Sequence, residues 1–267
     1  MSSTARTDLG RALCIITGAS RGFGRTVATE MSRLVKPGSV LVLTARSADD
    51  LRALQAELAE SEAGRAGLVV EYVAADLSQM EGLESIVRVS REAFSEDMDH
   101  VLLVNNAGSL GDVSRNAKAF TDMAEVDSYL SFNVSSSLCL TASVLQAFPQ
   151  RPGQQRTVIN ITSLCALQPF RSWVLYCTSK AAREMMFRVL AEEEPDLRVL
   201  SYSPGPLDTD MQMLARTRTA DPSIRKSFSD MFAQGQLLTC EASCAKLMKV
   251  LLEDEYRTGA HVDVYDV

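Results

Sequence analysis

The stretch Ala12–Gly24, ALCIITGASRGFG, decides the fold of this chain. Its first six residues, which end at Thr17, are mostly apolar and partly β-branched, so they predict a buried strand. Three glycines follow, and a periodic segment then continues to Leu34 and predicts a helix. A strand, a glycine-rich turn and a helix in this order are typical of a site that binds a dinucleotide.

The turn has the chemistry that a pyrophosphate needs. A glycine backbone approaches phosphate oxygens without a Cβ clash, and the helix after it offers unpaired N–H groups and the positive end of its dipole. The spacing Gly-x-x-x-Gly-x-Gly differs by one residue from the commoner fingerprint, and an ordinary strand-to-helix turn also uses glycine, so the rest of the chain must decide. The residues expected to bind the cofactor here are Gly18, Ala19, Ser20, Arg21, Gly22, Phe23 and Gly24.

Length and composition limit the class of protein. The 267 residues suit one large α/β domain, which we expect to span residues 1–267. A net charge of −7 argues against nucleic acid as the main partner. Met1–Gly10 is polar, and no apolar run approaches the ~20 residues that span a bilayer, so we expect a cytoplasmic protein without a membrane partner. Six cysteines without a Cys-x-x-Cys pair and only two histidines predict reduced thiols and no metal site.

Apolar segments alternate with helical segments along the whole chain. After the first strand, further strands are expected at residues 39–45, 68–75, 101–104, 157–161, 198–202 and 261–264. Helices are expected at residues 49–62, from 76–78 to about 95, and at 123–148, 173–193 and 240–253, with helical pieces within 208–236. This alternation predicts an α/β fold of the doubly wound type, with a mostly parallel sheet of seven strands and helices on both faces.

Polar or glycine-rich residues follow six of these strands. Ligands of such sheets bind beyond the carboxyl ends of the strands, so these residues are expected to meet at one edge. The residues concerned are Gly18–Gly24, Arg46, Asp76, Asn105–Gly108, Thr162–Ser163 and Pro204–Asp210.

Arg46 indicates which nicotinamide cofactor is bound. Dehydrogenases that prefer NAD usually carry an acid at this position, where it holds the ribose hydroxyls. A cation suits the 2′-phosphate of NADPH instead, and Arg21 can approach the same phosphate with its own bidentate fork. The other interpretation makes Arg46 a solvated charge at a helix entry. Asp76 is placed to accept a hydrogen bond from the adenine amino group, to cap the next helix, or to do both.

Ser163, Tyr176 and Lys180 form the candidate catalytic group. Tyr176 and Lys180 lie one turn apart on one helical face. An ammonium ~4 Å away would stabilise the phenolate by about 4 kcal/mol and lower the tyrosine pKa by up to ~3 units. Tyr176 then donates a proton to a carbonyl oxygen that Ser163 orients, Lys180 also holds the nicotinamide ribose, and Asn133 holds a water that links Lys180 to solvent. On its own, a Tyr-x-x-x-Lys pair fits an ordinary amphipathic helix equally well.

Together these motifs resemble the short-chain dehydrogenase/reductase family, in family order and over nearly the whole chain. The motifs are Thr17-Gly18-x-x-x-Gly22-x-Gly24, Asn105-Asn106-Ala107-Gly108, Asn133, Ser163, Tyr176-x-x-x-Lys180 and Pro204-Gly205. The resemblance implies a Rossmann-type fold, a Ser-Tyr-Lys active site assisted by an Asn, and dimers or tetramers formed through the long helices after strands four and five; we expect a homodimer. Outside the glycine-rich turn, the residues expected to bind NADPH or NADP⁺ are Arg46, Ser47, Asp76, Leu77, Asn105, Ala107, Gly108, Tyr176, Lys180, Leu207, Asp208, Thr209, Asp210, Met211 and Gln212.

Within that family the chain resembles the members that reduce side-chain carbonyls of pterins with NADPH, in the last steps of tetrahydrobiopterin synthesis. The segments that carry this resemblance are Gly18–Gly24, Asn105–Val113, Ser163–Phe170, Ser203–Met211 and Gly259–Asp266. It implies that Asp263 anchors the pterin ring, whose N–H and exocyclic amino group are two adjacent donors that one carboxylate can accept. By sequence alone, Asp263 is only an acid on the last strand. The residues expected to bind substrate are Ser163, Leu164, Tyr176, Gly205 and Asp263.

Two other interpretations remain. The same machinery can serve a general carbonyl reductase that acts on small dicarbonyl compounds, quinones or steroids. A protein that only senses NADPH would have lost Tyr176 or Lys180, and both are present. The stretch Asp208–Gln236 is expected to cover the substrate and to set specificity.

Overall fold

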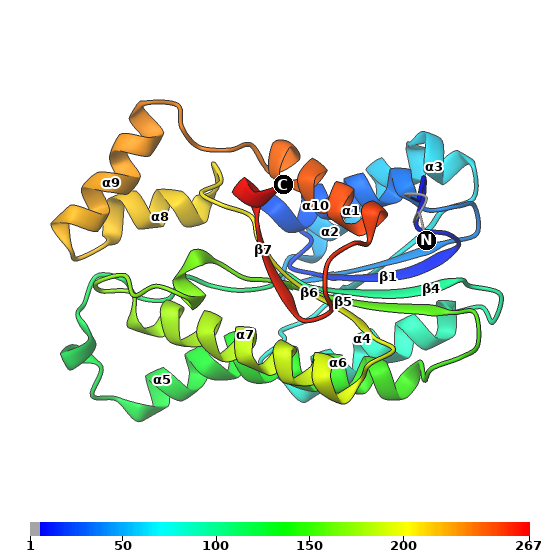
Figure 1. The fold of residues 1–267 in the computed structure, drawn as a ribbon, viewed down its shortest axis with the longest axis horizontal. Coiled ribbons are helices and arrows are strands. Elements are labelled where there is room, and N and C mark those ends of the chain that lie inside the picture. Colours follow the sequence, from blue (N-terminus) through cyan, green and yellow to red (C-terminus); the bar gives the residue numbers. More distant parts are fainter. Residues whose placement is uncertain (1–5) are drawn as a thin grey trace.

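The computed structural model describes residues 6–267, so Met1–Ala5 of the predicted domain lie outside the described residues (Figure 1). Seven strands form one sheet in the order β3-β2-β1-β4-β5-β6-β7. Every neighbouring pair is parallel, which confirms the predicted doubly wound sheet and makes it wholly parallel. The strands are β1 (Ala12–Thr17), β2 (Val40–Ala45), β3 (Val69–Ala74), β4 (His100–Asn105), β5 (Gln155–Ile161), β6 (Arg198–Ser203) and β7 (Ala260–Asp263).

Helices cover both faces of this sheet. In Figure 1, α1, α2 and α10 lie on one face, α4, α6 and α7 lie on the other, and α8 and α9 extend beyond the sheet. The helices are α1 (Gly22–Leu34), α2 (Ala48–Glu60), α3 (Glu62–Arg65), α4 (Met80–Ala93), α5 (Met123–Leu130), α6 (Ser136–Ala147), α7 (Val174–Glu193), α8 (Asp210–Arg218), α9 (Pro222–Ala233) and α10 (Cys240–Glu253).

The alternation of side chains along β1 explains the two layers of core. Cys14 and Ile16 pack with the α1 and α10 side of the sheet, whereas Leu13 and Ile15 pack with the α4 and α6 side. Successive residues of a strand point to opposite faces, so a strand with helices on both sides must be apolar throughout. All six residues of β1 are buried, as the sequence predicts.

The long helical region expected at residues 123–148 is confirmed as far as Ala147, and a π-helical turn, Ser131–Ser135, lies within it between α5 and α6. One local prediction was wrong. The Asp76 side chain does not cap α4, because that helix starts only at Met80. Asp76 Oδ1 instead accepts hydrogen bonds of 2.9 Å from both the backbone N–H and the hydroxyl of Ser78. A short polar side chain that closes its own turn in this way competes with helix capping.

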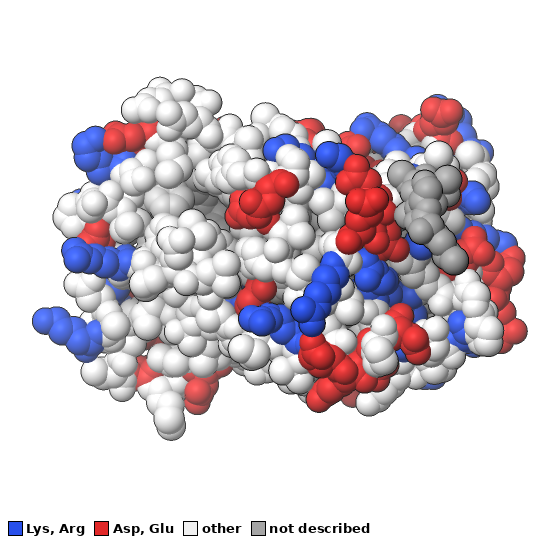
Figure 2. Space-filling view, in the orientation of Figure 1, with Lys and Arg blue, Asp and Glu red and all other residues white. Residues whose placement is uncertain are grey.

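The surface near α8 and α9 differs from the rest of the view in Figure 2. A hollow lies between these two helices and the layer that contains α5 and α7, and it is bordered mostly by uncharged residues. No helix in the described part of the chain is both long and apolar enough to cross a membrane.

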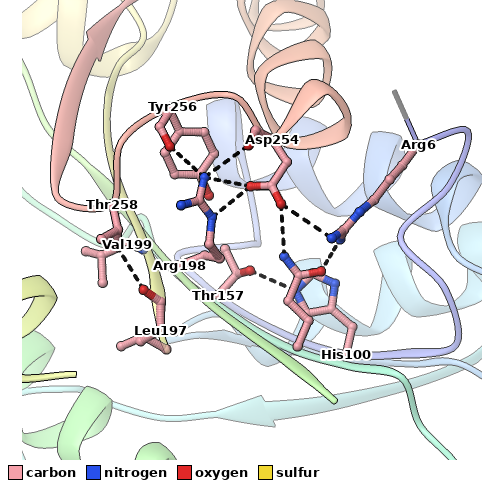
Figure 3. Close-up of polar contacts among 10 residues, drawn as sticks. Arg6, His100, Thr157, Leu197, Arg198, Val199, Asp254, Tyr256 and Thr258 are labelled. Atoms are coloured by element: carbon pink, nitrogen blue, oxygen red, sulfur yellow. Dashed lines mark hydrogen bonds and ion pairs between the residues drawn. The ribbon is translucent and has the colours of Figure 1, made fainter. Parts of the chain in front are cut away.

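At the amino end of the sheet, Asp254 joins several chain segments (Figure 3). Its carboxylate accepts a hydrogen bond of 2.8 Å from Arg198 Nε and lies 3.4 Å from the guanidinium of Arg6. Nearby, His100 Nε2 lies 2.8 Å from the hydroxyl of Thr157. These contacts join β6 to the end of α10 and β4 to β5, at the end of the sheet opposite the candidate site.

Candidate active site

The glycine-rich turn is shaped by its close approach to the end of β4. Gly18 has a φ of +68°, and a Cβ atom on it would lie 2.8 Å from Asn106 Nδ2. A Cβ on Gly24 would lie only 2.3 Å from the Gly18 carbonyl oxygen. No side chain caps the start of α1, so its first N–H groups point into the turn unpaired by a side chain. This cradle fits the phosphates of a dinucleotide.

Asn106 and its neighbours tie the turn to β4. Asn106 Nδ2 donates to the Thr17 carbonyl at 2.8 Å, and the Ala107 N–H donates to the Thr17 hydroxyl at 3.0 Å. Asn105, a predicted cofactor ligand, is buried and directs its amide to the hydroxyl of Thr141 on α6 at 2.9 Å. The Asn105 side chain is therefore engaged within the protein. The segment Asn105–Gly108 offers mainly its backbone to a cofactor.

Arg46 and Asp76 follow neighbouring strands and act on each other. Two hydrogen bonds from Ser78 and, more weakly, the charge of Arg46 lower the pKa of Asp76. The Arg46 guanidinium also lies 6.0 Å from the ring centre of Phe132. Ser47, the next residue, caps α2 by accepting from the Asp50 N–H. A cation beside an acid at this edge fits the adenosine end of a phosphorylated dinucleotide.

The start of α8 lies against the glycine-rich turn. Thr209 Cγ2 would lie 3.6 Å from a Cβ on Gly22, and Arg21 forms an exposed ion pair of 2.8 Å with Asp210. The Asp210 carboxylate therefore competes with a cofactor phosphate for the Arg21 guanidinium. Of the other residues predicted to bind the cofactor, Asp208 is exposed. The side chains of four more pack inside the protein: Leu77, Leu207, Met211 and Gln212.

Tyr176 and Lys180 lie buried in the first turns of α7. Lys180 Nζ lies 5.5 Å from the centre of the Tyr176 ring and donates a hydrogen bond of 2.7 Å to the Ile161 carbonyl on β5. The ring of Trp173 meets Tyr176 edge-on at 5.7 Å between ring centres. The predicted pair is therefore brought together and held by packing and a hydrogen bond.

Ser163 occupies the turn after β5, beside Tyr176. Its Oγ accepts from the Cys165 N–H at 3.2 Å and so caps the short 3₁₀ helix Leu164–Ala166. A hydrogen bond with Ser163 also acts to lower the pKa of Tyr176. The serine is thus within reach of the same oxygen that Tyr176 would protonate.

The predicted lowering of the tyrosine pKa was wrong for this structure. Burial raises the pKa of Tyr176, which outweighs the opposing effects of the Ser163 hydrogen bond and the Arg183 charge. Burial and the charge of Arg183 hold the pKa of Lys180 well below its usual range. With its raised pKa, Tyr176 keeps its proton near neutral pH, and the protonated form is the one that can act as a general acid, although a weaker acid than an exposed tyrosine.

Asn133 lies in the π-helical turn, beside Lys180. Its Oδ1 accepts from the Ser109 N–H at 2.7 Å, and its Nδ2 donates to the Tyr129 carbonyl at 2.9 Å. The Asn133 side chain is thus fixed by the protein on both sides, and the free lone pair of Oδ1 is the group left for a water.

Sequence reasoning missed Arg183. This side chain lies on α7 three residues after Lys180, is fully buried, and donates to Asn160 Oδ1 at 2.9 Å and to the Ala107 carbonyl at 3.0 Å. The only signal in the sequence was its position on the same helical face as Lys180.

Asp263 ends β7 at the same edge of the sheet, opposite Ser203 of β6. Its Oδ1 accepts a hydrogen bond of 3.1 Å from the Tyr265 N–H, and its Oδ2 takes no part in this bond. Gly205 has a φ of +77°, and a Cβ on it would lie 2.8 Å from Val264 Cγ1, so the two predicted substrate residues are on adjacent segments. Leu164 and Tyr265 are exposed there and add apolar surface.

These features define a nucleotide-dependent oxidoreductase on a Rossmann-type sheet. A family model described as short chain dehydrogenase matches residues 12–220, and the chain belongs to this family. It is similar to the sepiapterin reductase of Bos taurus, with 53% identity over 97% of this chain and 96% of that protein, and to the sepiapterin reductase of Xenopus laevis, with 50% identity over 100% of both. Among solved structures, the L-sorbose reductase of Gluconobacter frateurii, complexed with NADPH and L-sorbose, is 25% identical with a TM-score of 0.78, covering 97% of this chain and 96% of that one.

Proposed function

We propose that this chain reduces the side-chain carbonyl of sepiapterin and related pterins with NADPH, as a step of tetrahydrobiopterin synthesis, in which sepiapterin becomes 7,8-dihydrobiopterin. The observation that carries the proposal is the likeness to sepiapterin reductases from end to end of the chain. The substrate residues expected outside the catalytic group, Gly205 and Asp263, lie within the part of the chain that this likeness covers. A general carbonyl or dicarbonyl reductase is the less favoured alternative.

In this proposal, the glycine-rich turn and Lys180 would hold NADPH, which when bound would supply the hydride that the carbonyl carbon receives. Tyr176 donates its proton to the carbonyl oxygen as the C=O electron pair moves onto that atom, which leaves the alcohol and a phenolate. Ser163 donates a hydrogen bond to the same oxygen and fixes its position. Lys180 holds the nicotinamide ribose and, with Asn133 and a water, returns a proton to Tyr176. Keeping these groups buried strengthens each interaction.

We also propose that Arg46 selects NADPH by binding the 2′-phosphate, since a guanidinium and a phosphate form a charge-assisted pair. Asp263 anchors the pterin through its donors, and the hollow near α8 and α9 admits the ring system (Figure 2).

The assembly belongs to the proposal as well. Three exposed apolar side chains, Leu138 on α6 and Met185 and Val189 on α7, favour a homodimer formed through these helices. The protomer acts as one domain in the cytoplasm.

The test follows NADPH oxidation with sepiapterin, beside a simple vicinal diketone, and with NADH as the cofactor control. Turnover at micromolar sepiapterin with a strong preference for NADPH is the expected result. The variant Asp263→Asn keeps the acceptor for the Tyr265 N–H but removes the charge. It should raise the KM for sepiapterin roughly tenfold or more, because a hydrogen bond to a charged group contributes about 1.5–3 kcal/mol. Turnover of the diketone alone, in the unmodified protein, would contradict the pterin assignment.

A further inference from the structure

Arg183 is a buried cation to which the proposed reaction assigns no step. Its guanidinium donates from Nε to Asn160 Oδ1 and from its two terminal nitrogens to the carbonyls of Ala107 and Asn105. Within residues 6–267 no carboxylate forms an ion pair with it, so neutral oxygens alone surround its charge. Burial lowers the pKa of Arg183 to about 10, which still leaves it protonated at neutral pH.

Stability does not explain this arrangement. A buried charge without a counter-ion is unfavourable, and well-packed apolar residues in such positions are often as stable or more so. Arg156, on β5, shows the usual solution: it is also buried, but it pairs with Glu194 at 3.3 Å and donates to Gln150. The two arginines therefore form a natural comparison, one paired and remote from the site, the other unpaired and inside it.

The oxygens that Arg183 binds belong to the walls around Lys180. Asn105 and Ala107 lie where the chain leaves β4 and turns toward Gly108. A second terminal N–H contact, at 3.5 Å, reaches the Asn133 carbonyl in the π-helical turn. One side chain on α7 thus connects both segments that face Lys180.

We propose that Arg183 is a positioning residue for the reaction: its buried guanidinium fastens the end of β4 and the π-helical turn around Lys180. This inference rests on the proposed roles of Tyr176 and Lys180.

Two substitutions test the fastening role. Arg183→Gln removes the charge and Arg183→Lys keeps it, and both lose the planar fork that reaches Asn105, Ala107 and Asn160 together. The value of kcat should fall roughly tenfold or more in both variants, because the segments that position Lys180 are released. Both variants should bind NADPH several-fold more weakly by fluorescence titration, because each loses contacts to the segment Asn105–Ala107.

Arg156→Gln and Arg156→Lys are the matched controls, and all four variants are compared by thermal unfolding. The controls should lose stability without any change in kcat or in NADPH affinity. If kcat and NADPH affinity in Arg183→Gln and Arg183→Lys match those of the Arg156 controls, the fastening role is overturned. The unmodified protein tests the proposed function separately, and the kinetic comparison uses whichever carbonyl it reduces.

Discussion

Asn133 and Lys180 face each other across Gly108: a Cβ atom on this glycine would lie 3.5 Å from Asn133 Oδ1 and 3.9 Å from Lys180 Nζ. The two side chains come from the π-helical turn and from α7, so their meeting depends on how α5, α6 and α7 pack. The glycine keeps the space between them narrow and free of side chain. We propose that one water beside Gly108 links the Asn133 amide oxygen to the Lys180 amine, as the proton path for Lys180.

Replacing Tyr176 with Phe should reduce turnover by at least about a hundredfold, because general acid catalysis contributes 10²–10⁴-fold to such reactions. The ring contact with Trp173 is retained, so NADPH binding should change little. Steady-state kinetics and fluorescence titration measure the two effects. Tyr129→Phe is the matched control, since it loses a buried hydroxyl that donates to the Ser109 carbonyl at 2.8 Å but has no proposed step. A phenylalanine variant with turnover equal to this control would remove Tyr176 from the role of proton donor.

Replacing Arg46 with Ala should weaken NADPH binding roughly tenfold to a hundredfold, since hydrogen bonds to charged groups contribute about 1.5–3 kcal/mol. NADH lacks the 2′-phosphate, so its affinity should hardly change. Direct binding titrations with both cofactors give the comparison. Arg52→Ala serves as the control, because Arg52 is an exposed arginine on α2 that already pairs with Asp49. An equal loss of affinity for NADPH and NADH would show that Arg46 does not recognise the 2′-phosphate.

Much of the fold was predictable because the chain alternates apolar strands with helices. The residues Ala12–Thr17 are buried on both faces, and a run of this kind has few alternatives in an α/β protein. The π-helical turn was not predictable, because Ser131–Ser135 contains no glycine or proline and fits an ordinary helix equally well. The contacts of Asn133 with Ser109 and Tyr129 form only in the folded protein, and they accompany the π-helical geometry.

The candidate site was also predictable from the sequence only in part. Spacing was enough to bring Tyr176 and Lys180 together, because four residues make about one helical turn. The electrostatics were not predictable from spacing, since burial, which depends on the whole fold, governs the pKa of both side chains. Arg183 was missed for a related reason: a sequence pattern assigns an arginine to the surface unless a partner acid is visible, and here the partners are backbone and amide oxygens.

Replacing Gly24 with Ala should destabilise the protein by about 1–3 kcal/mol and abolish NADPH binding, because overpacking a tight contact displaces the backbone. A Cβ there would overlap the Gly18 carbonyl oxygen and Asn106 Nδ2, both at 2.3 Å. Urea unfolding and cofactor titration test this. Gly108→Ala is the stability control, since its nearest atoms would lie at ordinary contact distances. Equal stability of the two variants would mean that the turn is less confined than the structure indicates.

The two histidines should give the stability of this protein opposite responses to pH. Burial lowers the pKa of His100 to about 4, so between pH 6.5 and 4 the unfolded state binds more protons than the folded state. Stability should therefore fall as the pH drops through this window, by about 3 kcal/mol when the whole shift is counted. His261 is different, because its contact of 3.2 Å with Glu184 raises its pKa. Its contribution is fully present below pH 6.5 and is lost as the pH rises through the raised folded value.

Urea unfolding from pH 5 to pH 9 separates these effects. His100→Gln should flatten the decline on the acid side, and His261→Gln should flatten the decline above neutrality, each leaving the other side unchanged. The pair formed by His261 and Glu184 joins β7 to α7, two residues before Asp263 and four residues after Lys180. If His261→Gln kept the full decline between pH 7 and pH 9, the histidine would not be charged in the folded protein, and the link between the predicted substrate anchor and the catalytic helix would have to rest on packing alone.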